Sequence, residues 1–94
     1  MSYELVILIL ELQDRLGVPM EFLSKPCALM TFGELHGELT KFRDSEACPP
    51  GAYICNLNDV EVWYQLCEIV QEIYGPVKIV ISSNMKVGEI LYGE

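Results

Sequence analysis

The stretch Asn58–Pro76, NDVEVWYQLCEIVQEIYGP, carries the strongest structural pattern in the chain. Asn58 or Asp59 can cap a helix, and Gly75 followed by Pro76 is the usual order of residues where a helix ends. Between them the polar residues share one stripe of a helix, and large apolar residues lie opposite. The pattern therefore predicts a helix from Asp59 to about Tyr74. The polar residues are Glu61, Gln65, Glu68 and Glu72, and the apolar residues opposite them are Trp63, Leu66, Val70 and Ile73.

The apolar arc of this helix is wider than one layer of sheet can cover, because Val62 and Ile69 extend it on one side and Val60, Tyr64 and Cys67 on the other. Either a helix from the N-terminal segment packs alongside, or part of the arc contacts another protein. The predicted partner-binding residues are those of the polar stripe and its neighbouring tyrosine: Glu61, Tyr64, Gln65, Glu68 and Glu72.

Two short segments on either side of this helix resemble strands. Ala52–Asn56 follows the Cys48-Pro49-Pro50-Gly51 turn, and the β-branched run Val77–Ile81 lies between Pro76 and a Ser-Ser-Asn turn. Strand, helix and strand in this order predict a right-handed βαβ crossover. The tail Met85–Tyr92 is a candidate third strand. The predicted fold class is α+β: residues 1–94 form one small two-layer domain with helices on one face of a short mixed sheet.

A second helix is predicted to begin at Thr31-Phe32-Gly33-Glu34, which has the form of a capping box. Its apolar residues continue at helical spacing through about Arg43. Gly33 and Gly37 weaken helix propensity, and at this spacing they offer a flat strip that another backbone can approach.

The segment Met30-Thr-Phe-Gly-Glu-Leu35 is similar to Met85-Lys-Val-Gly-Glu-Ile90 later in the chain. Residues 30–56 also resemble the Thr-x-Gly-Glu-Leu helix openings of small uncharacterised phage-encoded proteins. That resemblance implies a helix running through a proline-containing turn into a strand, and it implies no activity.

The N-terminal segment Tyr3–Leu16 is predicted as a helix ended by Gly17-Val18-Pro19, with a strand over Tyr3–Leu10 as the rival interpretation. Its wet face should carry Glu4, Glu11 and Arg15. Leu8 interrupts that stripe, so we expect a homodimer that buries this leucine, with Leu8, Glu4, Glu11 and Arg15 as the self-association residues.

The chain is acidic, with 14 Asp and Glu against 6 Lys and Arg and a formal charge of -8. Such a charge repels phosphate backbones and anionic lipids, so direct nucleic-acid and membrane binding are not expected. The expected partner is another protein, with a basic surface.

Four scattered cysteines and one histidine are the residues with chemical potential. Cys27, Cys48, Cys55 and Cys67 lack paired metal-ligand spacing, and no export signal precedes them, so they are predicted to be reduced, metal-free thiols in a cytoplasmic protein. No nucleotide or cofactor motif is present in the sequence, and no catalytic, cofactor or metal residue is predicted.

Together these features predict a small acidic protein-binding module without enzymatic activity, either an adaptor or an inhibitor. A specific version is a phage-type, viral inhibitor of a nucleic-acid-binding host protein, in which carboxylates stand in for phosphates. The alternatives are a small thiol- or metal-dependent enzyme that uses His36 with a cysteine, and a self-associating structural subunit.

Overall fold

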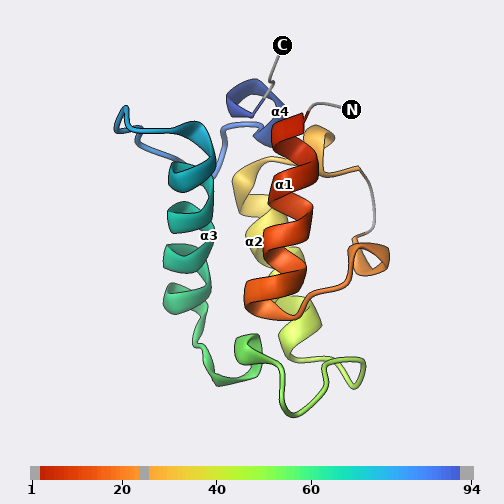
Figure 1. The fold of residues 1–94 in the computed structure, drawn as a ribbon. Coiled ribbons are helices and arrows are strands. Elements are labelled where there is room, and N and C mark those ends of the chain that lie inside the picture. Colours follow the sequence, from red (N-terminus) through yellow and green to blue (C-terminus); the bar gives the residue numbers. More distant parts are fainter. Residues whose placement is uncertain (1–2, 24–25, 92–94) are drawn as a thin grey trace.

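The structure, a computed structural model, describes residues 3–23 and 26–91 and is built from helices (Figure 1). The main helices are α1 (Tyr3–Glu11), α2 (Phe32–Arg43) and α3 (Asp59–Tyr74), followed by the short α4 (Val87–Ile90). A π-helical turn, Leu12–Leu16, extends α1, and single 3₁₀ turns occupy Met20–Phe22, Cys27–Leu29 and Tyr53–Asn56. The three helices predicted from the sequence correspond to α1 with its π-helical turn, α2 and α3, and are thus confirmed.

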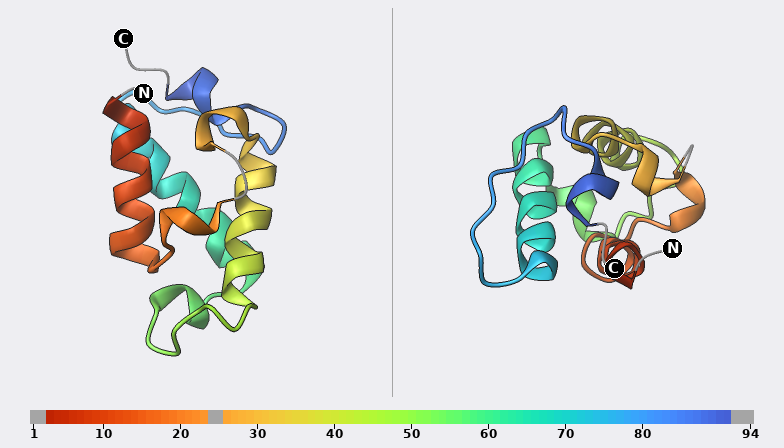
Figure 2. Two further views of the ribbon diagram at one scale, coloured as in Figure 1. Left: turned by 90° about the vertical axis from the view of Figure 1, so that its right-hand side faces the viewer. Right: turned by 90° about the horizontal axis from the view of Figure 1, so that it is seen from above.

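Helix α3 packs against both α1 and α2, and the three helices enclose the core (Figure 2). Its first turn is closed by a capping box, in which the Glu61 amide donates to Asn58 Oδ1 (2.8 Å) and the Asn58 amide donates to Glu61 Oε1 (2.9 Å). A cap of this kind stabilises a helix by about 1 kcal/mol. The buried residues of α3 are Val62, Leu66, Ile69 and Val70. Helix α1 therefore packs alongside α3, as the first explanation required, while Val60 and Tyr64 at one side of the arc stay exposed.

Leu8 is fully buried in the core, so its expected position on the wet face of the first helix is wrong. The Glu4, Glu11 and Arg15 stripe faces the flank of α3, and the exposed side of α1 instead carries Tyr3, Val6 and Leu10. The π-helical turn, which ends at the positive φ of Gly17, rotates Arg15 relative to an uninterrupted α-helix. A dimer that rests on an exposed Leu8 thus loses its basis.

The predicted α+β fold is wrong, because the described residues form no sheet. Ala52–Asn56 contains a 3₁₀ turn, Val77–Ile81 is extended but pairs with no strand in the described part of the chain, and α4 occupies the expected third strand. Tyr92, the end of that expected strand, lies outside the described residues. A β-branched run favours extended backbone, but a sheet also requires a second strand beside it, and here the Gln71 side chain bonds the edge that faces α3.

The two similar sequence segments pair with each other in an antiparallel arrangement that we call the clasp, formed by residues 28–35 and 83–90. One isolated β-bridge joins Thr31 to Lys86, and equivalent backbone hydrogen bonds lie on its two sides. Phe32 N donates to Met85 O (2.8 Å), and the equivalent Val87 N donates to Met30 O (2.9 Å). The clasp is thus a local pseudo-twofold, in which each segment turns from an extended bridge into the start of a helix.

Two glycines allow the clasp to close. A Cβ on Gly33 would lie 2.9 Å from Ser83 O, and a Cβ on Gly88 would lie 2.8 Å from Ala28 O, the equivalent position. Gly37, in contrast, has no atom within 4 Å of its Cβ position. Of the two glycines proposed for a flat strip on the second helix, only Gly33 meets another backbone.

We predict opposite effects for alanine at two glycines of the same helix. Gly33→Ala should lower the free energy of unfolding by about 1–2 kcal/mol, because the new methyl group pushes against a backbone oxygen. Gly37→Ala should raise it by up to about 1 kcal/mol through helix propensity alone. Urea denaturation followed by circular dichroism measures both, and equal effects of the two substitutions would contradict the clasp.

Candidate protein-binding surface

A groove of about 360 Å³ runs between α1 and the C-terminal half of α3. Its apolar floor comes from both helices, with Ile7 from α1 and Ile69 and Ile73 from α3. Its rim is charged, and Tyr3 closes one end. The charged lining residues are Glu4, Glu11, Arg15 and Glu72.

Arg15 connects the two rims through a network of ion pairs. Its Nε lies 2.6 Å from Glu11 Oε1, its Nη1 donates to Glu72 Oε2 (3.1 Å), and its Nη2 is paired with Glu72 Oε1. Glu68 lies at the edge of this network, with Oε1 3.9 Å from Arg15 Nη1. One guanidinium thus faces three carboxylates, and Glu4 adds a fourth to the same groove, so the rim keeps an excess of negative charge.

The network lowers the pKa of Glu72 below its ordinary value, chiefly through the hydrogen bond from Arg15. The same bond raises the pKa of Arg15. Both groups therefore stay ionised through the physiological range.

Beside the groove, α1 exposes an apolar stripe to solvent. Tyr3 is 77%, Val6 39% and Leu10 50% exposed. These residues recur at spacings of three and four, so the sequence contained the signal for a stripe on one helix face. This apolar stripe was not predicted, because the solvent-exposed side of the helix was assigned to its acidic residues.

The predicted partner-binding residues of α3 do not form one surface. Glu68 and Glu72 join the acidic residues of α1, the predicted self-association residues, at the rim of the groove. Glu61 is engaged in the helix cap, and Gln65 is half-buried. Tyr64, 66% exposed, lies on the flank of α3 turned away from the groove.

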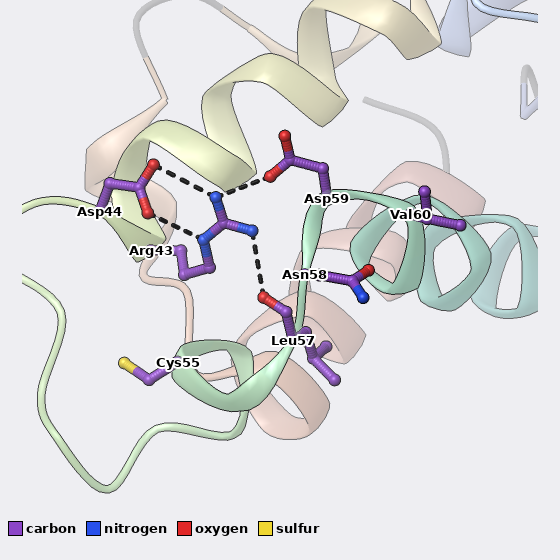
Figure 3. Close-up of a pocket in the computed structure, with 7 residues that line it drawn as sticks. All are labelled: Arg43, Asp44, Cys55, Leu57, Asn58, Asp59 and Val60. Atoms are coloured by element: carbon purple, nitrogen blue, oxygen red, sulfur yellow. Dashed lines mark hydrogen bonds and ion pairs between the residues drawn. The ribbon is translucent and has the colours of Figure 1, made fainter.

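A second hollow, of about 520 Å³, surrounds Arg43 at the contact between α2 and the start of α3 (Figure 3). Arg43 Nε and Nη2 donate to the two carboxylate oxygens of Asp44 (2.9 and 3.2 Å). Nη2 also pairs with Asp59 (2.7 Å), and Nη1 donates to Leu57 O (3.1 Å). Every nitrogen of the guanidinium thus already donates to a protein oxygen. The cluster therefore links two helices and is not an anion site. The hydrogen bonds from Arg43 also lower the pKa of Asp44.

His36 belongs to the same helix contact. Its Nε2 lies 2.8 Å from Asp59 O, and its ring meets Trp63 edge-on with the ring centres 5.4 Å apart. Within residues 3–23 and 26–91, no group of three or more His, Cys, Asp or Glu is arranged to hold a metal ion. The structure therefore gives His36 a packing contact and brings no cysteine into its hydrogen bonding.

The cysteines divide into a bonded pair and two thiols. Cys48 and Cys55 form a disulfide across the Pro-Pro-Gly turn, so the prediction of four reduced thiols is wrong for this pair. Cys27 and Cys67 are free. Burial raises the pKa of Cys27 to about 11 and also raises that of Cys67.

Comparisons with protein-family models, with curated proteins and with solved structures find no significant match for this chain. Among the described helices, none has both the length and the apolar character required to cross a bilayer.

The ion pairs of Arg15 should make the free energy of unfolding depend on pH. The pKa of Glu72 is lowered in the folded state, so its stabilising effect is complete above its ordinary value of 4.5 and is lost as the pH falls below it. Glu72→Gln should therefore be less stable than the wild type at pH 7, and the difference should disappear as the pH falls through the lowered pKa of Glu72. Thermal unfolding across this range, with Glu46→Gln as the control for an exposed carboxylate, measures the difference. A gap that stays constant with pH would contradict the ion pair.

The thiols should react unequally. In the folded protein at pH 8, alkylation should label Cys67 before Cys27, because the buried Cys27 is almost entirely protonated there. After unfolding without reductant, mass spectrometry should show these two labels alone, with Cys48 and Cys55 labelled only after reduction. Four labels without reductant would show that the pair is reduced, as is usual in the cytoplasm.

Proposed function

We propose that this protein is a small protein-binding module without enzymatic activity, whose surface between α1 and α3 binds a basic amphipathic helix of another protein. The observation that carries the proposal is the combination of an apolar floor with an acidic rim. A helix with lysines or arginines beside its apolar face satisfies both requirements at once.

The apolar stripe of α1 supports the same occupant. A helix lying in the groove reaches Tyr3 and Leu10 at its side, and burying their exposed surface adds to the contact made by the floor. The negative rim then favours basic partners and speeds their association, since opposite charges steer diffusional encounter.

A narrower form of the proposal is inhibition of a nucleic-acid-binding protein, as in phage-encoded inhibitors. Its support is chemical: Glu4, Glu68 and Glu72 present carboxylates around the groove, where a basic surface would otherwise meet phosphates. The proposal places this interaction in the cytoplasm, on the ground that Cys27 and Cys67 are free thiols. The Cys48–Cys55 disulfide is the observation that argues against that compartment.

A synthetic helical peptide with leucines on one face and lysines on the other is the probe that tests the binding function. Calorimetry should give a micromolar Kd that weakens as salt is added. Leu10→Ser should weaken binding by about tenfold through lost apolar burial, and Glu68→Lys by about threefold at low salt.

The controls separate this surface from general acidity. Val60→Ser removes an equally exposed apolar residue at the far end of α3, and Glu46→Lys reverses a charge on another loop. Neither should change the Kd by more than about twofold. Equal binding of a scrambled peptide, or equal weakening by the controls, would overturn the proposal.

A further inference from the structure

The segment after α3, Val77–Ile81, runs along the outer side of that helix, where Ile79 and Ile81 pack against the core and the Gln71 side chain bonds its backbone (Figure 2). Gln71 Nε2 donates to Val77 O (2.8 Å) and to Gly75 O (3.0 Å), and Ile79 N donates to Gln71 Oε1 (3.0 Å). The glutamine amide thus bonds one edge of the segment in the way that a neighbouring strand would.

Among the described residues, none forms a backbone hydrogen bond to the opposite edge. Backbone groups of alternate residues in an extended chain point to opposite sides, so those of Lys78 and Val80 point away from Gln71. The structure gives these two residues no backbone hydrogen bond within the described ranges. The Val80 side chain is 89% exposed and that of Val77 65%, which leaves a β-branched strand edge open to solvent.

The charge around this edge suits contact between two copies of the chain. The sequence from Ile73 to Gly88 contains no Asp or Glu, and its charged residues are Lys78 and Lys86. Glu68 and Glu72 of α3 line the hollow on the inner side of the segment together with Lys78, so this lysine offsets part of their negative charge where two copies meet.

We propose that Val77–Ile81 pairs with the same segment of a second copy, forming a homodimer through a two-stranded antiparallel ribbon. In the register that suits the free edge, Ile79 faces Ile79 of the other copy on the twofold axis. Lys78 then faces Val80 of the other copy, and each such pair exchanges both of its N–H···O bonds. The two lysines are not directly opposed, and β-branched residues pair across the strands.

The pairing closes at two chains, because Gln71 already occupies the inner edge of each segment. An isologous contact of this kind uses up the free edge and leaves none for further growth. This dimer lies on a surface other than the α1 and α3 groove, so it does not depend on the proposed binding of a basic helix.

Val80→Pro and Val80→Thr are the matched pair that tests the dimer. Proline removes the Val80 N–H, which has no partner in the described chain, so the monomer should fold as before while the dimer loses bonds on both sides of its axis. Threonine keeps the amide and the β-branched shape. In sedimentation over a hundredfold concentration range, the wild type and Val80→Thr should pass from 10.6 kDa to twice that mass. Val80→Pro should stay at 10.6 kDa, with its dissociation constant raised by at least about tenfold.

A measurement on the wild type keeps the test independent of how the proline variant folds. Hydrogen exchange at the Lys78 and Val80 amides should slow as protein concentration rises, while exchange at the Val77 amide should not. A wild-type mass of 10.6 kDa throughout, assemblies larger than a dimer, or exchange that is independent of concentration would each overturn the proposal.

Discussion

The antiparallel clasp between residues 28–35 and 83–90 is the constraint on which the rest of the structure depends. Its backbone bonds fix where α2 begins and bring the C-terminal segment back across the end of the core, where Val87 and Leu91 are fully buried together with Met30 and Phe32. Ordering the C-terminal segment costs conformational entropy. The backbone hydrogen bonds of the clasp help to offset that cost, because they satisfy amides that would otherwise be buried without a partner. Close approach of two backbones at Gly33 and Gly88 makes this possible.

The exposed surfaces follow from the same constraint. Because the chain has to travel from the end of α3 to the clasp, residues 75–82 run beside α3 and show one edge to solvent. Because α3 is covered by α1 on one flank and by this segment on another, Glu68 and Glu72 lie between the two, where Arg15 meets them. The acidic groove and the open strand edge thus lie on either side of α3, and both result from the way in which this helix is packed.

Local patterns in the sequence were enough to predict the three main helices and the caps of the second and third, since a capping box such as Thr31 with Glu34 needs residues only three positions apart. The strands could not be predicted correctly, because the extended form of Val77–Ile81 is a local preference while a sheet depends on a distant partner. The acidic residues of the candidate site were identified from the sequence. That those of α1 and those of α3 line one groove was not predicted. Leu8 was misplaced because nothing in the sequence says which side of α1 meets the core and which meets the groove. The similarity of the two clasp segments was visible, but their mutual pairing is a tertiary fact.

Native-state hydrogen exchange at the clasp tests this account most directly. The amides of Phe32, Gly33 and Val87 donate to Met85, Ser83 and Met30, so they should exchange only through global unfolding, with the same free energy as the amide of Leu39 in the middle of α2. Exchange of these amides at the rate of an exposed loop, while Leu39 remains protected, would show that the C-terminal segment is not held against α2 and would contradict the account.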